Sequence, residues 1–256
     1  MITHDQIKLY AFDLDGTVYV GDELIPGAKE TLEALNERAA VCYLTNNSSK
    51  TKAEYLDKLH RLGLQAEEGN VITSLDATIA YVDTHLKGRS VYLVGTDSVV
   101  REAQERGLSL DERQPDAVIV TLDTTLTYEK LCTLCRFLQQ GALYLATHPD
   151  KKCPAPGGFV PDVGSFLALV EAVTGRSPDV VCGKPFRPTA ELLERRFGCS
   201  GREIMMVGDR LSTDIRLGID NGYRTCAVLT GETTRDMLKD SAIRPELVLD
   251  SLADLV

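Results

Sequence analysis

Short apolar runs alternate with segments of helical period along most of the chain. Residues 9–14, 41–45 and 204–207 are apolar runs of strand length, while residues 28–38 and 52–62 place apolar side chains at helical spacing. Continuous apolar runs are typical of strands that are buried on both faces, as in parallel sheets covered by helices. The alternation therefore predicts an α/β fold built on a parallel sheet.

The middle of the chain shows the same alternation. Strands are predicted at 91–94, 117–121 and 143–146, with helices between them and a further helix at 75–86. The pattern returns near the C-terminus, where a helix is predicted at 213–220. Strands are predicted on either side of it, at 204–207 and 225–229, and a last short strand begins near 248. The middle stretch could therefore form an α/β unit of its own.

Composition excludes two classes of partner. The formal net charge is −10 and the pI is about 5.0, whereas binding to a phosphate backbone requires a basic surface. No apolar run reaches the length that spans a bilayer, and the N-terminus lacks a basic stretch followed by an apolar segment. We expect a cytoplasmic protein that binds neither nucleic acid nor membrane.

Cysteine spacing gives a weak metal signal. Cys132 and Cys135 form a C-x-x-C pair inside a segment of helical period, and no second Cys/His pair of ligand spacing accompanies them. A zinc site normally needs four ligands. The seven cysteines are therefore interpreted as structural thiols of a reducing compartment.

Asp13-Leu14-Asp15-Gly16-Thr17 follows the first apolar run. Ligands bind outside the carboxyl ends of the strands in open α/β sheets, and two neighbouring carboxylates require a cation to stay ionised together. If the strand continues, Asp13 and Asp15 point the same way, but a turn at Gly16 would let one of them swing away. An acidic pair that only caps the next helix is the structural alternative.

Two further motifs follow apolar segments. Thr45-Asn46-Asn47-Ser48 offers a hydroxyl and backbone N–H groups that suit a phosphoryl group, although the same residues could cap a helix. Gly183-Lys184-Pro185 offers an ammonium that could neutralise a carboxylate and a phosphate, although single lysines are usually solvated.

A fourth motif lies near the C-terminus. Asp209 directly follows the apolar run at 204–207 and is expected in the same row as Asp13 and Asp15. Asp214 begins the next helix, where it could support a metal site or simply be a favourable first-turn acid. All four motifs follow predicted strands, and each offers a polar group suited to phosphate or Mg²⁺ chemistry. A separate structural explanation for each of the four is therefore improbable.

In this order, FDLDGT, LTNNS, GKP and GDRLSTD resemble the four motifs of the haloacid dehalogenase superfamily of phosphotransferases. The match spans nearly the whole chain. LDGTVYVGDELIPGA, VITS, TLTYEKL and ATHPD are similar to the NagD-like, or para-nitrophenylphosphatase, branch, although ATHPD has His148 where that branch has Asn. The resemblance implies a Mg²⁺-dependent phosphatase that hydrolyses small phosphomonoesters through an aspartyl-phosphate intermediate.

The resemblance also assigns roles by position. It implies Asp13 as nucleophile and metal ligand, and Asp15 as general acid/base and metal ligand through its carbonyl. Thr45 and the backbone of Asn46 would hold the phosphoryl group. The remaining assignments are Lys184 steadying Asp13 and the transferring phosphate, Asp209 completing the Mg²⁺ site, and Asp214 supporting it.

The spacing of the motifs predicts the domains. Asp15 to Thr45 is 30 positions and Lys184 to Asp209 is 25, but Thr45 to Lys184 is 139, and only the last gap has room for an inserted domain. We expect a Rossmann-like core with three α/β/α layers at 1–83 plus 178–256, and a smaller α/β cap of the C2 type at 84–177 that screens the substrate. Within the cap, the resemblance points to His148, Asp150 and Asp123 as candidates for substrate contact; an exposed loop histidine is the alternative for His148.

Other functions fit the sequence less well. A catalytically silent phosphate-binding module would not need every catalytic position, and a phosphoacceptor signalling domain would be shorter and lack D-x-D-G-T. A phosphomutase of this superfamily would carry its cap between the first two motifs. The expected partner is a small phosphorylated metabolite such as a sugar phosphate or a nucleoside monophosphate, and the resemblance is compatible with a homodimer formed through the cap.

Overall fold

The computed structural model describes residues 6–155 and 157–256, and these form two compact units. The first unit comprises the described residues up to Thr45, together with Lys52–Ile72 and Lys184–Val256. The second comprises Asn46–Thr51 and Thr73–Gly183. Among the described residues, no helix is both long and apolar enough to cross a membrane.

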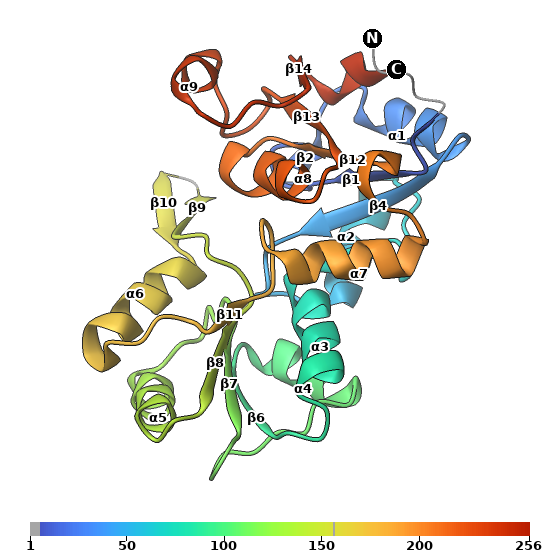
Figure 1. Ribbon diagram of the computed structural model, residues 1–256. Coiled ribbons are helices and arrows are strands. Elements are labelled where there is room, and N and C mark those ends of the chain that lie inside the picture. Colours follow the sequence, from blue (N-terminus) through green and yellow to red (C-terminus); the bar gives the residue numbers. More distant parts are fainter. Residues whose placement is uncertain (1–5, 156) are drawn as a thin grey trace. The chain divides into compact units, whose positions relative to one another are not determined.

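A six-stranded sheet forms the centre of the first unit (Figure 1). Its strands, in spatial order, are β14 (Leu247–Leu249), β13 (Arg224–Val228), β12 (Ile204–Gly208), β1 (Leu9–Phe12), β4 (Ala40–Thr45) and β5 (Val71–Thr73). The pairs on either side of β1 and β12 are parallel. Every residue of β1 and β12 is buried, as expected for strands covered on both faces.

Helices of the first unit connect these strands. They are α1 (Ala28–Asn36), α2 (Lys52–Arg61), α7 (Arg187–Phe197), α8 (Arg216–Asp220) and α9 (Arg235–Asp240), with short 3₁₀ turns at Gly201–Glu203 and Leu252–Leu255 and one π turn at Leu211–Ile215. A small antiparallel hairpin, β2 (Tyr19–Val20) and β3 (Glu23–Leu24), follows β1. The core beneath these elements includes the buried side chains of Phe12, Leu35 and Tyr43.

The second unit has its own sheet of four parallel strands (Figure 1). In spatial order these are β11 (Val180–Val181), β8 (Leu143–Ala146), β7 (Ala117–Val120) and β6 (Val91–Val94). Its helices are α3 (Ser74–His85), α4 (Asp97–Glu105), α5 (Tyr128–Gln139) and α6 (Val163–Thr174), and an antiparallel hairpin is formed by β9 (Lys152–Ala155) and β10 (Gly158–Pro161).

The predicted α/β class is confirmed, and the main sheet and the separate smaller sheet match the expectation. Most predicted elements occur within a residue or two of their expected bounds. The exception is the helix expected at 213–220, which is a π turn followed by the short α8. The expected cap bounds, 84–177, stay a prediction; contacts within the chain group α3 with the second unit. Residues 1–5 of the expected core lie outside the described residues.

All seven cysteines are free thiols. Cys132 is exposed on α5, whereas Cys135 is buried, and burial raises the pKa of the Cys135 thiol. Among the described residues, neither cluster of side chains that could hold a metal contains a cysteine. A structural interpretation of the C-x-x-C pair therefore remains the simpler one.

Candidate active site

Three candidate residues lie at one edge of the main sheet because three neighbouring parallel strands end there. Asp13 follows β1, Thr45 ends β4 and Asp209 follows β12. The strand order also reverses at β1, since the chain proceeds to β4 and β5 on one side and returns to β12 and β13 on the other. Ligands bind at such a switch point in open α/β sheets.

Lys184 is the centre of the polar cluster in the first unit. Its Nζ lies 2.5 Å from Asp13 Oδ1, 2.7 Å from Asp214 Oδ1 and 3.2 Å from the carbonyl oxygen of Leu44. These three oxygens match the three donors of an ammonium. Only 2% of the lysine is exposed. The expectation that single lysines are solvated does not hold here, because two carboxylates compensate the buried charge.

The two carboxylates also keep the ammonium protonated. Burial alone would lower the pKa of Lys184 and is the largest single influence, but the charges of Asp13 and Asp214 outweigh it and raise the pKa above its usual value. Lys184 is therefore a permanent positive charge beside Asp13.

The two carboxylate oxygens of Asp209 differ in their surroundings. Its Oδ2 accepts a hydrogen bond of 2.6 Å from the backbone N–H of Glu232, while Oδ1 is buried and has no hydrogen-bond partner among the described residues. Burial, with the charges of Asp13 and Asp214, raises the pKa of Asp209 to about 8. A buried acceptor without a partner is costly, so this site fits a bound cation.

The acidic groups are close enough to share one ion. Asp13, Asp209 and Asp214 each offer an oxygen within 4.8 Å of the others. Both oxygens of Asp214 are already engaged, however: Oδ1 pairs with Lys184 and Oδ2 accepts a 3.0 Å bond from the backbone N–H of Arg210. Asp13 Oδ1 also pairs with Lys184, and its Oδ2 accepts a long bond of 3.4 Å from a hydroxyl. Oxygen donors at this spacing suit Mg²⁺.

Asp15 lies in a different environment from Asp13. Strand β1 ends at Phe12, so the alternation of faces does not extend to these residues. Asp13 is partly buried, whereas Asp15 is exposed and accepts a long bond of 3.4 Å from the hydroxyl of Tyr19. An exposed carboxyl group can exchange its proton with water, which is what an acid/base residue requires.

Residues 230–233, a loop after β13, also reach this edge, and the sequence reasoning missed them. Thr230 donates a 2.6 Å bond to the carbonyl oxygen of Gly16, and the N–H of Thr233 donates to the carbonyl oxygen of Asp209. Arg210 Nε lies 3.5 Å from a Glu232 carboxylate oxygen, so it braces the same loop. The available signal was a Thr-Gly pair directly after an apolar strand, which is the context of the other motifs.

The close approach of this loop to Asp209 leads to a stability prediction. A Cβ added at Gly231 would lie 2.0 Å from Asp209 Oδ2, so the side chain of Asp209 or the loop must move. We expect Gly231→Ala to lower the free energy of unfolding by about 1–3 kcal/mol, the usual cost of overpacking. Urea unfolding would measure it, with Gly69→Ala as the matched control, because a Cβ at Gly69 meets nothing within 4 Å. Equal stability of the two variants would contradict this geometry.

In the second unit, Asn46 is held by two hydrogen bonds and lies close to the backbone of Gly183. Its carbonyl oxygen accepts a 2.5 Å bond from Ser74 Oγ, and its side-chain amide donates a 3.0 Å bond to Asp150 Oδ2. A Cβ at Gly183 would lie 2.7 Å from Asn46 Oδ1, so glycine is needed there for the close approach. The conformation of Asn46 is therefore well determined by its neighbours.

His148 is not the exposed loop histidine of the alternative interpretation. It is fully buried, its Nε2 lies 2.8 Å from Asp162 Oδ1, and its Nδ1 lies 3.1 Å from Thr147 Oγ1. Asp150 is only partly buried. Contact of either residue with a substrate stays a prediction, and the geometry favours an indirect role for His148.

Asp123 is engaged in its own turn. Its carboxylate accepts bonds from the N–H and hydroxyl of Thr125 and pairs with Lys130 Nζ at 2.6 Å, and the aspartate is 1% exposed. A structural role accounts for these contacts.

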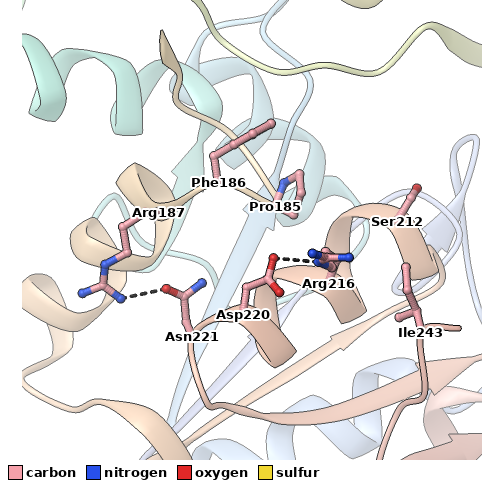
Figure 2. A pocket seen from close by; sticks show the side chains of 8 residues that line it. All are labelled: Pro185, Phe186, Arg187, Ser212, Arg216, Asp220, Asn221 and Ile243. Atoms are coloured by element: carbon pink, nitrogen blue, oxygen red, sulfur yellow. Dashed lines mark hydrogen bonds and ion pairs between the residues drawn. The ribbon is translucent and has the colours of Figure 1, made fainter. Parts of the chain in front are cut away.

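A pocket of about 530 Å³ lies elsewhere in the first unit (Figure 2). Four of the side chains that line it pair with one another: Arg187 donates to Asn221, and Arg216 pairs with Asp220. Its lining residues are Pro185, Phe186, Arg187, Ser212, Arg216, Asp220, Asn221 and Ile243. The candidate catalytic residues are not among them.

Comparison with known proteins agrees with this geometry. Residues 10–109 match the family of haloacid dehalogenase-like hydrolases, and residues 181–255 match a second family described as HAD-hydrolase-like. The chain is 35% identical over 250 residues to the 5'-nucleotidase YutF of Bacillus subtilis, which covers 97% of both chains. It is 34% identical over 253 residues to an acid sugar phosphatase of Staphylococcus aureus, covering 98% of this chain and 97% of the relative.

Solved structures show the same relationship. The 4-nitrophenylphosphatase of Thermotoga maritima superposes with a TM-score of 0.95 at 39% identity, covering 98% of this chain and 97% of that one. NagD of Escherichia coli K-12 gives a TM-score of 0.90 at 27% identity, covering 98% of both. The chain belongs to the haloacid dehalogenase-like hydrolases, in the branch of NagD and the para-nitrophenylphosphatases.

Proposed function

We propose that this chain is a Mg²⁺-dependent phosphatase that hydrolyses small phosphomonoesters through an aspartyl-phosphate on Asp13. The observation that carries the proposal is the contact of Lys184 Nζ with Asp13 Oδ1 at 2.5 Å, beside a buried Asp209 oxygen without a hydrogen-bond partner in the described part of the chain. A carboxylate nucleophile, a fixed positive charge and a cation site are what phosphoryl transfer to a side chain requires.

Each residue has a separate task in this proposal. Asp13 attacks the phosphorus and forms the covalent intermediate, and Lys184 neutralises charge on Asp13 and on the transferring phosphoryl group. Asp15 gives a proton to the leaving alkoxide in the first step and takes one from water in the second, which its exposure permits. Thr45 and the backbone of Asn46 hold the phosphoryl oxygens.

The Mg²⁺ ligands in this proposal are Asp13, Asp209 and the backbone carbonyl of Asp15, and Asp214 supports the site by holding Lys184. When bound, Mg²⁺ supplies positive charge that offsets the phosphoryl oxygens and the clustered carboxylates.

The substrate class is a small phosphorylated metabolite. The relatives at about 35% identity are named for a nucleotide, for sugar phosphates and for 4-nitrophenyl phosphate. They share a phosphomonoester and differ in the leaving group, so the phosphoryl site is the part that they have in common. We propose that the inserted domain at 84–177 selects the leaving group, with Asp150 as a candidate for contact.

The direct test is hydrolysis of para-nitrophenyl phosphate. Purified protein with Mg²⁺ is expected to release nitrophenol in a multiple-turnover reaction, and excess EDTA is expected to suppress it until Mg²⁺ is restored. Nucleoside monophosphates and sugar phosphates would then be ranked by kcat/KM. Stoichiometric phosphate binding without turnover would identify a silent binding module instead and would overturn the proposal.

Asp209→Asn tests the proposed metal site. It removes the charge that the cation would balance at a buried position, while keeping the shape and an oxygen of the side chain. We expect the Mg²⁺ concentration for half-maximal activity to rise at least about tenfold, as measured by titrating Mg²⁺ at saturating ester. Asp220→Asn on α8 is the exposed control. An unchanged Mg²⁺ requirement would exclude Asp209 as a ligand.

A further inference from the structure

A buried chain of hydrogen bonds runs from the loop after Thr45 to the start of α6. Ser48 Oγ lies 2.9 Å from Thr147 Oγ1, which lies 3.1 Å from His148 Nδ1. On the other side of the ring, His148 Nε2 lies 2.8 Å from Asp162 Oδ1. Ser48, Thr147 and His148 are 0% exposed and Asp162 is 6% exposed, so water does not compete for these contacts.

Each ring nitrogen of His148 has a buried partner. Asp162 accepts at Oδ1, where it also receives the N–H of Val163 as the N-cap of α6, so His148 Nε2 carries a proton. The other ring nitrogen, Nδ1, faces the hydroxyl of Thr147, which also donates a 3.3 Å bond to the carbonyl oxygen of Val120. Ser48 Oγ contacts Thr147 Oγ1 and accepts a 2.9 Å bond from the N–H of Leu122.

Ser48 is therefore held by contacts at the ends of two strands. Leu122 follows β7 and Thr147 follows β8, and both belong to the same unit as Ser48. One residue further along the loop, the hydroxyl of Thr96 donates to the carbonyl oxygen of Ser49 at 3.2 Å. The loop 46–49 is thus attached to the sheet of the second unit after three of its strands, β6, β7 and β8.

We propose that Thr147 and His148 are positioning residues for the loop 46–49, which they hold through Ser48. This rests on the proposed function, in which the backbone of Asn46 holds the phosphoryl group. His148 then governs affinity for the phosphoryl group that all substrates share, and it does not read the leaving group. Its role differs from the substrate contact expected from the sequence.

Substitutions at position 148 can remove one of the two ring contacts of His148 at a time. Asn has its amide at the level of Nδ1, so His148→Asn retains a partner for Thr147 and loses the contact with Asp162. Gln reaches to the level of Nε2, so His148→Gln retains a partner for Asp162 and loses the contact with Thr147. The pair distinguishes the link toward Ser48 from the link toward α6.

The experiment measures KM for para-nitrophenyl phosphate and the inhibition constant of inorganic phosphate. His148→Gln and Thr147→Val are expected to raise both constants by the same factor, about threefold to tenfold, the effect of one hydrogen bond. His148→Asn is expected to stay within about twofold of the wild type, although its melting temperature falls. Thr147→Ser restores the hydroxyl and should restore both constants, and the exposed His85→Gln is the matched control.

Substrate ranking separates this role from direct contact. If His148 acts through the loop, His148→Gln lowers kcat/KM for nucleotides, sugar phosphates and the nitrophenyl ester by one common factor. A changed ranking would show that His148 contacts the leaving group and would overturn the proposal. Unchanged constants in folded His148→Gln and Thr147→Val, with only lower melting temperatures, would also overturn it, because the contacts would then be purely structural.

Failure of the proposed function would give a different experimental result. Wild-type protein without Mg²⁺-dependent hydrolysis would overturn both proposals before any variant is compared. Active wild-type protein whose His148→Asn and His148→Gln variants are impaired equally would leave the phosphatase proposal standing and would overturn the role of the contact through Thr147.

Discussion

Asp13→Asn is expected to lower kcat for para-nitrophenyl phosphate by at least about 10⁴-fold, a loss typical of removing a nucleophile. The amide has nearly the shape of the carboxylate, but it carries no negative charge and is a poor nucleophile. Its oxygen can still accept from Lys184 Nζ, which lies 2.5 Å from Asp13 Oδ1 in the native chain. The fold should therefore persist while turnover disappears.

The measurement is the initial rate at saturating Mg²⁺, with circular dichroism to verify folding. Asp22→Asn is the matched control, because Asp22 is exposed in the turn between β2 and β3, and it should retain wild-type kcat. Retention of more than about 1% of the wild-type rate, a loss too small for a missing nucleophile, would remove Asp13 from that role. A low rate in Asp22→Asn would point to damage unrelated to the site.

The strands of the main sheet were predictable because each is long and apolar enough to carry a local signal. Strands β1 and β12 are buried along their whole length and read as continuous apolar runs. The hairpin β9–β10 was missed since Pro154 and Pro161 argue against a strand and its residues are largely exposed. Hairpin β2–β3 has two residues per strand, too few to show a period.

The candidate site was also predictable only in part. The motifs at Asp13, Thr45 and Asp209 follow strands of the main sheet, and parallel strands bring their ends to one edge. Lys184 follows β11 of the other sheet, so this rule does not place it. What a local pattern could not predict was which side chains become partners across the chain. Ser48 and Thr147 are 99 positions apart, and Lys184 and Asp13 are 171 apart. Such contacts depend on the order of strands in the sheets, which no spacing within a motif contains.

The burial of Lys184 shows how such distant contacts affect stability. A lysine in a Gly-Lys-Pro segment has no local feature that predicts 2% exposure. The burial is tolerable only because Asp13 and Asp214 both lie within 2.7 Å of its Nζ. The effects of substituting Lys184, Asp13 and Asp214 on stability are therefore not expected to be additive.

Lys184→Met is expected to lower the free energy of unfolding by about 3–5 kcal/mol, since it leaves the buried Asp214 and the partly buried Asp13 uncompensated. It should also lower kcat/KM by about 10²–10³-fold through loss of a charge at the reacting group. Urea unfolding and steady-state kinetics measure the two effects. Lys29→Met is the control, because Lys29 is half-exposed on α1 and its 4.0 Å ion pair with Glu33 should be worth less than about 1 kcal/mol.

A double variant separates the loss of stability from the loss of activity. Asp214 is fully buried and its Oδ1 lies 2.7 Å from Lys184 Nζ, so Asp214→Asn removes the charge that Lys184→Met leaves unpaired. The double variant should regain part of the stability lost in Lys184→Met, because a buried neutral amide costs less than an unpaired carboxylate. Its activity should stay low, since the positive charge beside Asp13 is still missing. Additive losses of stability in the double variant would mean that Lys184 and Asp214 are not coupled, and recovery of activity would mean that Lys184 acts on turnover only by offsetting the charge of Asp214.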